Sequence, residues 1–172
     1  MGIYGSQTQA GKSEADATKF LSSVLSNVVV QDDSGRAALQ TFTGGKGDVL
    51  ISYENEAIFA QQNGQDVDYV IPDSTLLIEN PVAVTKNSKH PKEAKAFLDF
   101  VHSPQAQEIF AQNGYRPVVD GAETAGQNFP TPPDLFTIAD LGGWDAVATK
   151  YFDVDKGIVT DIERKLGVSV EK

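Results

Sequence analysis

The chain has 172 residues, which is enough for one full domain or for two small lobes. With 40% hydrophobic and 22% charged residues, its composition is ordinary for a soluble globular protein. A formal net charge of −10 argues against nucleic acid and anionic membrane surfaces as partners. The lack of cysteine excludes disulfides, thiolate nucleophiles and cysteine-ligated zinc. No apolar run reaches the roughly 20 residues of a membrane-spanning helix, and the first residues lack a signal-peptide core.

Serine caps mark the first two predicted helices. Ser13 begins SEAD, a capping box in which Asp16 takes the usual Glu or Gln place. The segment DDSGRAALQTF predicts a turn and a short helix capped by Asp33 or Ser34. A third helix is predicted in NEAIFAQQNG and ends at Gly64. The first helix carries one apolar face at helical spacing, made of Ala17, Phe20, Leu21, Val24 and Leu25.

Three apolar stretches are predicted to be strands. DVLISY, residues 48–53, is a nearly continuous apolar run, which is the pattern of a strand covered on both faces in a parallel sheet. VDYVIP and TLLIENPVAVTK predict further strands, with Pro81 at a bend or an edge. Because these strands alternate with helices, an α/β protein is predicted.

The second half of the chain is predicted to be mainly helical. Two amphipathic helices are expected in PKEAKAFLDFVH and SPQAQEIFAQNG, the latter with Ser103 at its N-cap and Pro104 in its first turn. The proline-rich residues 129–133 are the best linker candidate. Two further helices are predicted in TIADLGGWDAVATKYF and DKGIVTDIERKLG.

The stretch GSQTQAGKS imitates a phosphate-binding loop without having its spacing. That loop needs Gly, four residues and then Gly-Lys-Ser or Gly-Lys-Thr, directly after a buried strand. The position five before Gly11 is Ser6, because Gly5 lies one residue too early. We therefore interpret this stretch as a polar loop that leads into the Ser13 cap.

Glu54 and Glu56 follow the predicted strand 48–53 and raise the question of acid–base catalysis. The paired carboxyls of a glycosidase usually come from different elements across the scissile bond. Residues two apart at a strand-to-helix junction point apart, and acids in a first helical turn complement the helix dipole. The dipole role is favoured, and a carboxylate-dependent hydrolase with Asp33 or Asp73 as second acid is the alternative.

The two histidines do not form a metal site. His90 and His102 lie at opposite ends of one predicted helix, roughly 18 Å apart at 1.5 Å per residue. Neither belongs to a recognisable nucleophile motif with Ser or Cys, so both are interpreted as surface or capping residues. No catalytic residue, metal ligand or cofactor is predicted.

The segment DDSGRAAL offers the most suggestive binding geometry. A sharp turn opens a helix there, and Arg36 lies on the first turn. Consecutive amides at a helix start, with the positive end of the dipole, can hold an anion whatever the net charge. An ordinary capped helix is the alternative, and the residues alone favour it because every helix begins in this way.

Three stretches in order, GDVLISYENEA, SPQAQEIFAQNGYRP and FTIADLGGW, carry a family resemblance. With VVVQDDSGRAALQTF and NPVAVTK, they make the chain resemble the sulfate/thiosulfate-binding proteins of ABC importers from about Tyr4 to about Gly157. The resemblance implies a type II periplasmic binding protein, whose two α/β lobes close around an oxyanion held by neutral hydrogen-bond donors. A fully ionised sulfate only accepts hydrogen bonds, so a donor-rich site selects it over protonated phosphate.

The resemblance also implies which residues bind the ligand. The family has a glycine/alanine helix start after a DSG-like turn, and the amides of Ala37 and Ala38 would be the donors here. This stretch is one residue shorter than the common family form. Tyr53 takes an aromatic position where the family often has Trp, and Ser52 lies beside it in the crevice. The ligand-binding residues so predicted are Gly35, Arg36, Ala37, Ala38, Ser52 and Tyr53.

The lobe organisation follows from the same resemblance. Residues 1–78 and 125–172 would form the C-terminal-type ligand-binding lobe, and 79–124 would belong to the other lobe. The crossings would lie near 78–82 and 118–130. The N-terminal lobe of the family, with its TSGGA-type donor segment, has no counterpart here, so a truncated form or fragment is expected. Helices of the second lobe would then expose apolar faces and favour self-association, through residues such as Phe97, Val101 and Phe110.

The predicted fold class is α/β: a type II periplasmic-binding-protein lobe with a mixed, largely parallel sheet flanked by helices, plus a remnant of the second lobe. The predicted function is that of a non-enzymatic solute-binding component of an ABC importer, which binds sulfate or thiosulfate. Its expected partners are the oxyanion and the importer's membrane subunits, at a periplasmic or cell-surface location. The alternatives are the Glu54/Glu56 hydrolase and an oligomerising interaction module.

Overall fold

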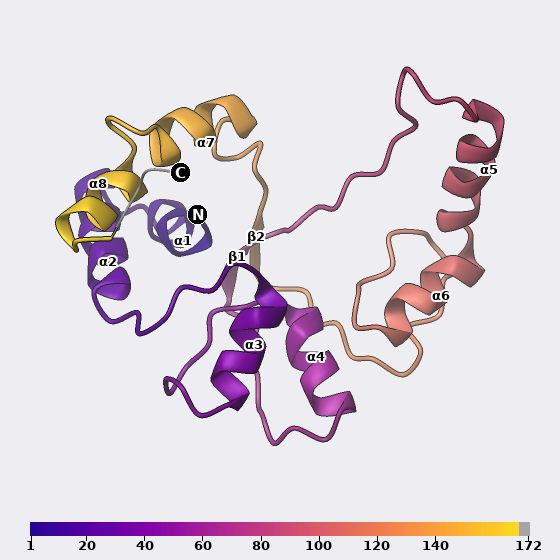
Figure 1. The fold of residues 1–172 in the computed structure, drawn as a ribbon, viewed down its shortest axis with the longest axis horizontal. Coiled ribbons are helices and arrows are strands. Elements are labelled where there is room, and N and C mark those ends of the chain that lie inside the picture. Colours follow the sequence, from indigo (N-terminus) through magenta and orange to yellow (C-terminus); the bar gives the residue numbers. More distant parts are fainter. Residues whose placement is uncertain (169–172) are drawn as a thin grey trace. The chain divides into compact units, whose positions relative to one another are not determined.

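The computed structural model describes residues 1–168. This part of the chain contains eight helices and one sheet of two strands (Figure 1). The elements in chain order are α1 (Gly2–Gln9), α2 (Glu14–Leu25), α3 (Gly35–Thr43), α4 (Glu54–Gln62), β1 (Ser74–Leu76), α5 (Pro91–Val101), α6 (Pro104–Gln112), β2 (Asp134–Phe136), α7 (Gly143–Phe152) and α8 (Ile158–Lys165).

The chain divides into two compact units. Unit 1 comprises Met1–Val29, Ile71–Ile78 and the chain from Thr131 onward, and unit 2 comprises Val30–Val70 and Glu79–Pro130. The sequence-based assignment of 1–78 and 125–172 to one lobe and of 79–124 to the other stays a prediction.

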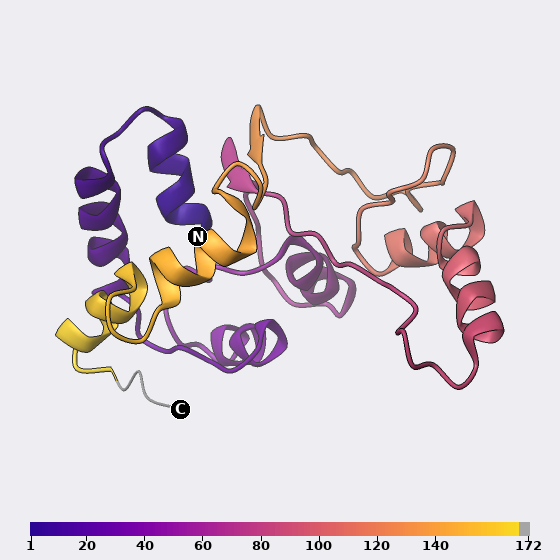
Figure 2. The same cartoon turned by 90° about the horizontal axis from the view of Figure 1, so that it is seen from above.

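Unit 1 is built around the parallel pair β1–β2. Ser74 lies opposite Asp134 and Leu76 opposite Phe136, and α1 packs on β1. Helix α2 lies beside α8, and α7 packs on α8 (Figure 2). The side chains that form the core are Tyr4, Ala17, Leu21, Leu76, Phe136, Ile138, Val147, Tyr151 and Ile162.

Helix α1 corrects the prediction of a polar loop before Ser13, because the chain is helical as far as Gln9. Its polar residues show no helical period of hydrophobicity, so packing and not an amphipathic face stabilises it. Tyr4 is fully buried and meets the ring of Tyr151 edge-on, with 5.1 Å between the ring centroids. Gly5 brings the backbone against Phe136: a Cβ atom added to Gly5 would lie 2.4 Å from the ring.

The predicted helices are confirmed, together with their caps. The Ser13 hydroxyl accepts the amide of Asp16 at 3.1 Å, and the Ser34 hydroxyl accepts the amide of Ala37 at 3.2 Å. Ser103 caps α6 in the same way, and Pro104 is its first residue. These signals act over three residues, so they do not depend on the rest of the fold.

The predicted strands are largely wrong. Among residues 1–168, residues 48–53 and VDYVIP belong to no strand, and only Ser74–Leu76 of the next apolar stretch lies in a sheet. Val49 is 79% exposed and Ile51 70% exposed, whereas a strand covered on both faces was expected. A strand needs a neighbour for its ladder, and the described residues provide none for 48–53.

Unit 2 contains α3 packed on α4 and α5 packed on α6. The Gln62 amide group donates to the carbonyl of Gln112 at 2.9 Å and so links α4 to the end of α6. The buried Gln107 side chain donates to the carbonyl of Val101 and accepts the amide of Val118, at 2.7 and 2.8 Å. None of the helices in residues 1–168 has the length and apolar character that crossing a membrane requires.

Gly5→Ala is expected to destabilise unit 1 by about 1–3 kcal/mol, because the added methyl group overpacks against Phe136. The clash outweighs the gain of up to about 1 kcal/mol in helix propensity. Urea unfolding followed by circular dichroism measures the change.

Gly2→Ala is the matched control in the same helix, because its Cβ would make an ordinary contact 3.9 Å from the Leu76 Cβ. It is expected to leave the urea midpoint unchanged or slightly higher, because only the gain in helix propensity remains. Equal midpoints for the two variants would contradict the close approach of α1 to β2.

Candidate functional site

The candidate anion site begins at the first turn of α3. Ser34 is its N-cap, and its hydroxyl accepts the Ala37 amide. The Ala38 amide donates to the Ser34 carbonyl at 2.9 Å. Among residues 1–168, the Gly35 and Arg36 amides have no hydrogen-bond partner. The amides open to a ligand are therefore those of Gly35 and Arg36, two residues before the pair Ala37 and Ala38 expected from the sequence.

Tyr53 lies beside this helix start. It is the N-cap of α4, and its ring packs against Gly35, where an added Cβ would lie 3.1 Å from the ring. Tyr53 is 51% exposed, and Ser52 before it is exposed. The structure thus brings Gly35 and Tyr53 together. The ligand-binding role of the set Gly35 to Ala38, Ser52 and Tyr53 stays a prediction.

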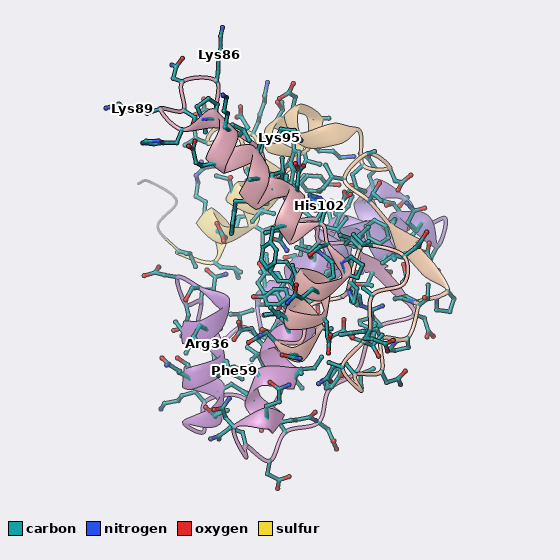
Figure 3. The ribbon with its side chains drawn as sticks, turned by 90° about the vertical axis from the view of Figure 1, so that its right-hand side faces the viewer. Arg36, Phe59, Lys86, Lys89, Lys95 and His102 are labelled. Carbon is teal, nitrogen blue, oxygen red and sulfur yellow. The ribbon has the colours of Figure 1, made fainter. Side chains whose placement is uncertain are left out.

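The Arg36 side chain is held by α4. Its Nε and Nη2 donate to the Glu56 carboxylate at 2.7 and 3.3 Å. Its Cζ lies 3.6 Å from the centroid of the Phe59 ring, and Figure 3 shows the two side chains together. The pKa of Arg36 lies above its ordinary value because the guanidinium hydrogen-bonds the Glu56 carboxylate. Such a bidentate ion pair fixes the relative orientation of the two side chains as well as bringing opposite charges together. It therefore links α3 and α4 at their first turns.

Glu54 has an arginine partner of its own. Arg116 Nε and Nη2 donate to the Glu54 carboxylate at 2.6 and 2.9 Å, and Nη2 also donates to the Pro130 carbonyl at 2.8 Å. Both acids lie in the first turn of α4, as the dipole interpretation expects. Neither carboxylate stands free to act as a general acid or base in this arrangement.

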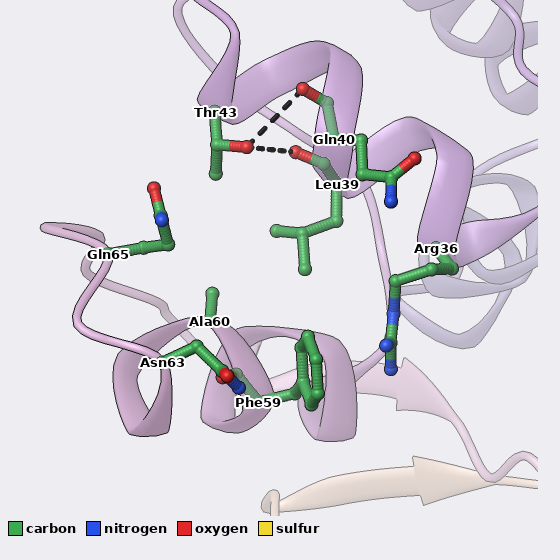
Figure 4. A pocket seen from close by; sticks show the side chains of 8 residues that line it. All are labelled: Arg36, Leu39, Gln40, Thr43, Phe59, Ala60, Asn63 and Gln65. Carbon is green, nitrogen blue, oxygen red and sulfur yellow. Dashed lines mark hydrogen bonds between the residues drawn. The ribbon is translucent and has the colours of Figure 1, made fainter.

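A shallow hollow of about 240 Å³ lies between α3 and α4 (Figure 4). Part of its polar lining is already hydrogen-bonded, because the Thr43 hydroxyl donates to the Leu39 carbonyl and the Asn63 amide group donates to the Phe59 carbonyl. Of the six predicted ligand-binding residues, Arg36 alone lines it, along with Leu39, Gln40, Thr43, Phe59, Ala60, Asn63 and Gln65. The hollow therefore does not coincide with the predicted set of ligand-binding residues.

Sequence reasoning missed the two arginine–glutamate pairs. Arg36 was considered only for an anion cradle, and the glutamate partners of Arg36 and Arg116 lie 20 and 62 residues away in the sequence. One local signal was available: Glu56 and Phe59 are three apart and share one face of α4. An arginine that forms an ion pair with Glu56 therefore also lies close to the Phe59 ring.

Potential metal ligands are dispersed. Residues 1–168 contain no group of three or more His, Asp or Glu side chains arranged to hold an ion. His90 and His102 flank α5 as its N-cap and C-cap residues.

Glu56→Gln is expected to lower the thermal midpoint by at least about 3 °C, because it breaks a pair whose acid is only 7% exposed. The control is Glu93→Gln, since Glu93 is likewise the third residue of its helix and is exposed. Differential scanning fluorimetry compares them. Equal midpoints would mean that Glu56 acts only through the helix dipole.

The comparison with protein families gives a broad match. Residues 4–116 match the family model described as bacterial extracellular solute-binding protein. Two similar relatives are a sulfate-binding protein of Synechococcus elongatus and a thiosulfate-binding protein of Escherichia coli. The first is 41% identical over 88% of this chain and 45% of its own length, and the second is 37% identical over 88% and 48%.

A solved structure agrees with these relatives. The sulfate-binding protein SubI from Mycobacterium tuberculosis superposes with a TM-score of 0.77 at 44% identity, over 88% of this chain and 54% of that one. The α/β periplasmic-binding-protein fold is thereby confirmed, with a small parallel sheet in the described residues. The chain spans about half the length of the curated relatives it matches. Since the family model covers well over half of the chain, the chain belongs to the bacterial extracellular solute-binding protein family.

Proposed function

We propose that this chain forms part of the solute-binding protein of an ABC importer that captures sulfate or thiosulfate. The observation that carries the proposal is the similarity, at 37–41% identity, to proteins named for binding these two anions. The structural match to SubI, a sulfate-binding protein, supports it independently. The function is capture and hand-over of the ion, with no covalent step.

The proposed ligand site is the start of α3 with Tyr53 beside it. Gly35 and Arg36 would offer backbone amides, and the Tyr53 hydroxyl would offer a side-chain donor. Ala37 and Ala38 belong to the same turn of α3, and Ser52 directly precedes Tyr53. Glu56 compensates the charge of the Arg36 guanidinium. The site would therefore recognise a dianion by neutral donors, and it would disfavour an anion that carries a proton of its own.

The hydrolase alternative has less support. It requires a free carboxylate at Glu54 or Glu56, and each is bound by an arginine. The relatives are named as binding proteins, and none of those compared is named as an enzyme.

The two-lobed organisation belongs to this proposal. Residues 1–78 and 125–172 would contribute to one lobe and 79–124 to the other, with the oxyanion between complementary sets of donors. The importer's membrane subunits would be the partners that receive the ion, at an extracytoplasmic location. The description of the family as extracellular supports that location.

The chain alone is expected to bind sulfate weakly or undetectably, because about half of the relatives' length lies outside the match. A fusion to the unmatched part of the Synechococcus elongatus relative is expected to bind it at micromolar protein. Isothermal titration with sulfate, thiosulfate, phosphate and molybdate tests both forms. Tight binding by the chain alone would contradict the shared-site account. A fusion that binds only phosphate or molybdate would contradict the assignment of sulfate or thiosulfate as the ligand.

Within that fusion, Tyr53→Phe is expected to weaken sulfate binding roughly tenfold or more, because a donor to a charged acceptor is lost. Tyr115→Phe removes a hydroxyl from an exposed tyrosine outside the proposed site and is the matched control. Equal affinities for the two variants would remove Tyr53 from the site.

A further inference from the structure

Helices α4 and α6 end in the same short sequence, Gln-Asn-Gly. Their C-cap residues are Asn63 and Asn113, and Gly64 and Gly114 follow. These are the Asn-Gly pairs of the chain. Such a pair is chemically labile, because glycine has no Cβ to shield its backbone nitrogen from the side-chain amide before it. Since the two sequences are alike, a difference in reactivity must come from the surroundings of each pair in the fold.

The reaction to which an Asn-Gly pair is prone is deamidation, and it needs only water as co-reactant. The glycine nitrogen bonds to the asparagine Cγ, and the Cγ–Nδ2 bond breaks. The side-chain nitrogen takes the proton that the glycine nitrogen loses and leaves as ammonia. Water then opens the cyclic succinimide at one of its carbonyl carbons, so that aspartate or isoaspartate replaces the asparagine.

The two helix ends oppose ring closure in the same way. At the end of α4, the Gly64 amide donates to the Gln61 carbonyl at 3.0 Å, and the Asn63 Nδ2 donates to the Phe59 carbonyl at 2.8 Å. At the end of α6, the corresponding groups donate over the same distances. The ψ angles, 18° at Asn63 and 15° at Asn113, hold the glycine nitrogen away from the Cβ side, where the ring would close. Each cap must therefore open locally before the reaction can occur.

The surroundings of the two glycines differ. Gly114 is buried against α4, and a Cβ atom added to it would lie 3.1 Å from the Ile58 Cβ. The Gln62 side chain of α4 also donates to the carbonyl of Gln112, two residues before Gly114. Gly64 is exposed, and an added Cβ atom would have no heavy atom of the described residues within 4 Å. Opening the α6 cap therefore breaks contacts with α4, whereas opening the α4 cap breaks only contacts that are local in the sequence.

We infer that Asn63 is a site of spontaneous deamidation in the folded chain, and that α4 protects Asn113 from the same reaction. An opening that must also break the Gln62–Gln112 hydrogen bond and the packing of Gly114 is rarer. Contacts of this size correspond to about a five- to thirtyfold lower population of the open cap. The inference is independent of the function proposed above and of the anion that is bound.

Deamidation at Asn63 changes the hollow between α3 and α4. Asn63 lines this hollow together with Arg36 (Figure 4). The product carries a carboxylate at the C-terminal end of α4, where the helix dipole disfavours negative charge. The isoaspartate product also lengthens the backbone within the cap, so the end of α4 loses its cap hydrogen bonds.

The test incubates the full chain at mildly alkaline pH, once folded and once unfolded in guanidinium chloride. Peptide mapping by mass spectrometry follows the gain in mass when OH replaces NH2 at each asparagine, and circular dichroism checks that the first sample stays folded. In the unfolded chain, both pairs are expected to react at similar rates. In the folded chain, Asn63 is expected to react at least about fivefold faster than Asn113.

A variant tests the source of the protection. Gln62→Ala removes the hydrogen bond to Gln112 and is expected to raise the rate at Asn113 in the folded chain about two- to tenfold. Gln105→Ala replaces an exposed glutamine of α6 and is expected to leave that rate unchanged. A rate at Asn113 that equals or exceeds the rate at Asn63 in the folded chain would overturn the inference. Retention of both amides in the folded chain, over a time in which the unfolded chain loses them, would overturn it as well.

Discussion

Two acids in the first turn of α4 organise unit 2. Glu54 forms an ion pair with Arg116, which follows α6 in the chain, and Glu56 forms an ion pair with Arg36 of α3. The start of α4 therefore holds two segments that are distant in the sequence through bidentate ion pairs, which are partly sheltered from water. The position of the Arg36 turn beside Tyr53, and hence the geometry of the candidate site, depends on these pairs.

These pairs also change the chemical character of the site. A free arginine at the start of α3 would attract any anion, including phosphate species that carry a proton. With its charge compensated by Glu56 and its plane stacked on Phe59, Arg36 would leave anion recognition at the proposed site to backbone amides and hydroxyls. The selectivity of the proposed site would then depend on the number of protons on the anion, because each proton needs an acceptor that these donors do not provide.

Features that join residues close in the sequence could be predicted from the sequence, whereas contacts between distant residues could not. The caps at Ser13, Ser34 and Ser103 each join residues three apart, and the structure has all three. Strand pairing joins Ser74 to Asp134, and no hydropathy pattern marks Asp134–Phe136 as a strand. The apolar run 48–53 predicted a strand that the described residues do not form, because strand pairing depends on a neighbour that the run itself does not specify. For the candidate site, the proximity of Tyr53 to Gly35 was foreseen through the family, whereas the ion pairs were not.

The parallel pair β1–β2 has a consequence for biosynthesis. β1 forms only when Asp134–Phe136 is available, and α1 rests on both β1 and the ring of Phe136. Helix α1 can therefore complete its packing only after the roughly 130 residues that separate it from the end of β2 have been synthesised, at about 5–20 residues per second. Until then it has α2 to pack on, but neither β1 nor the ring of Phe136.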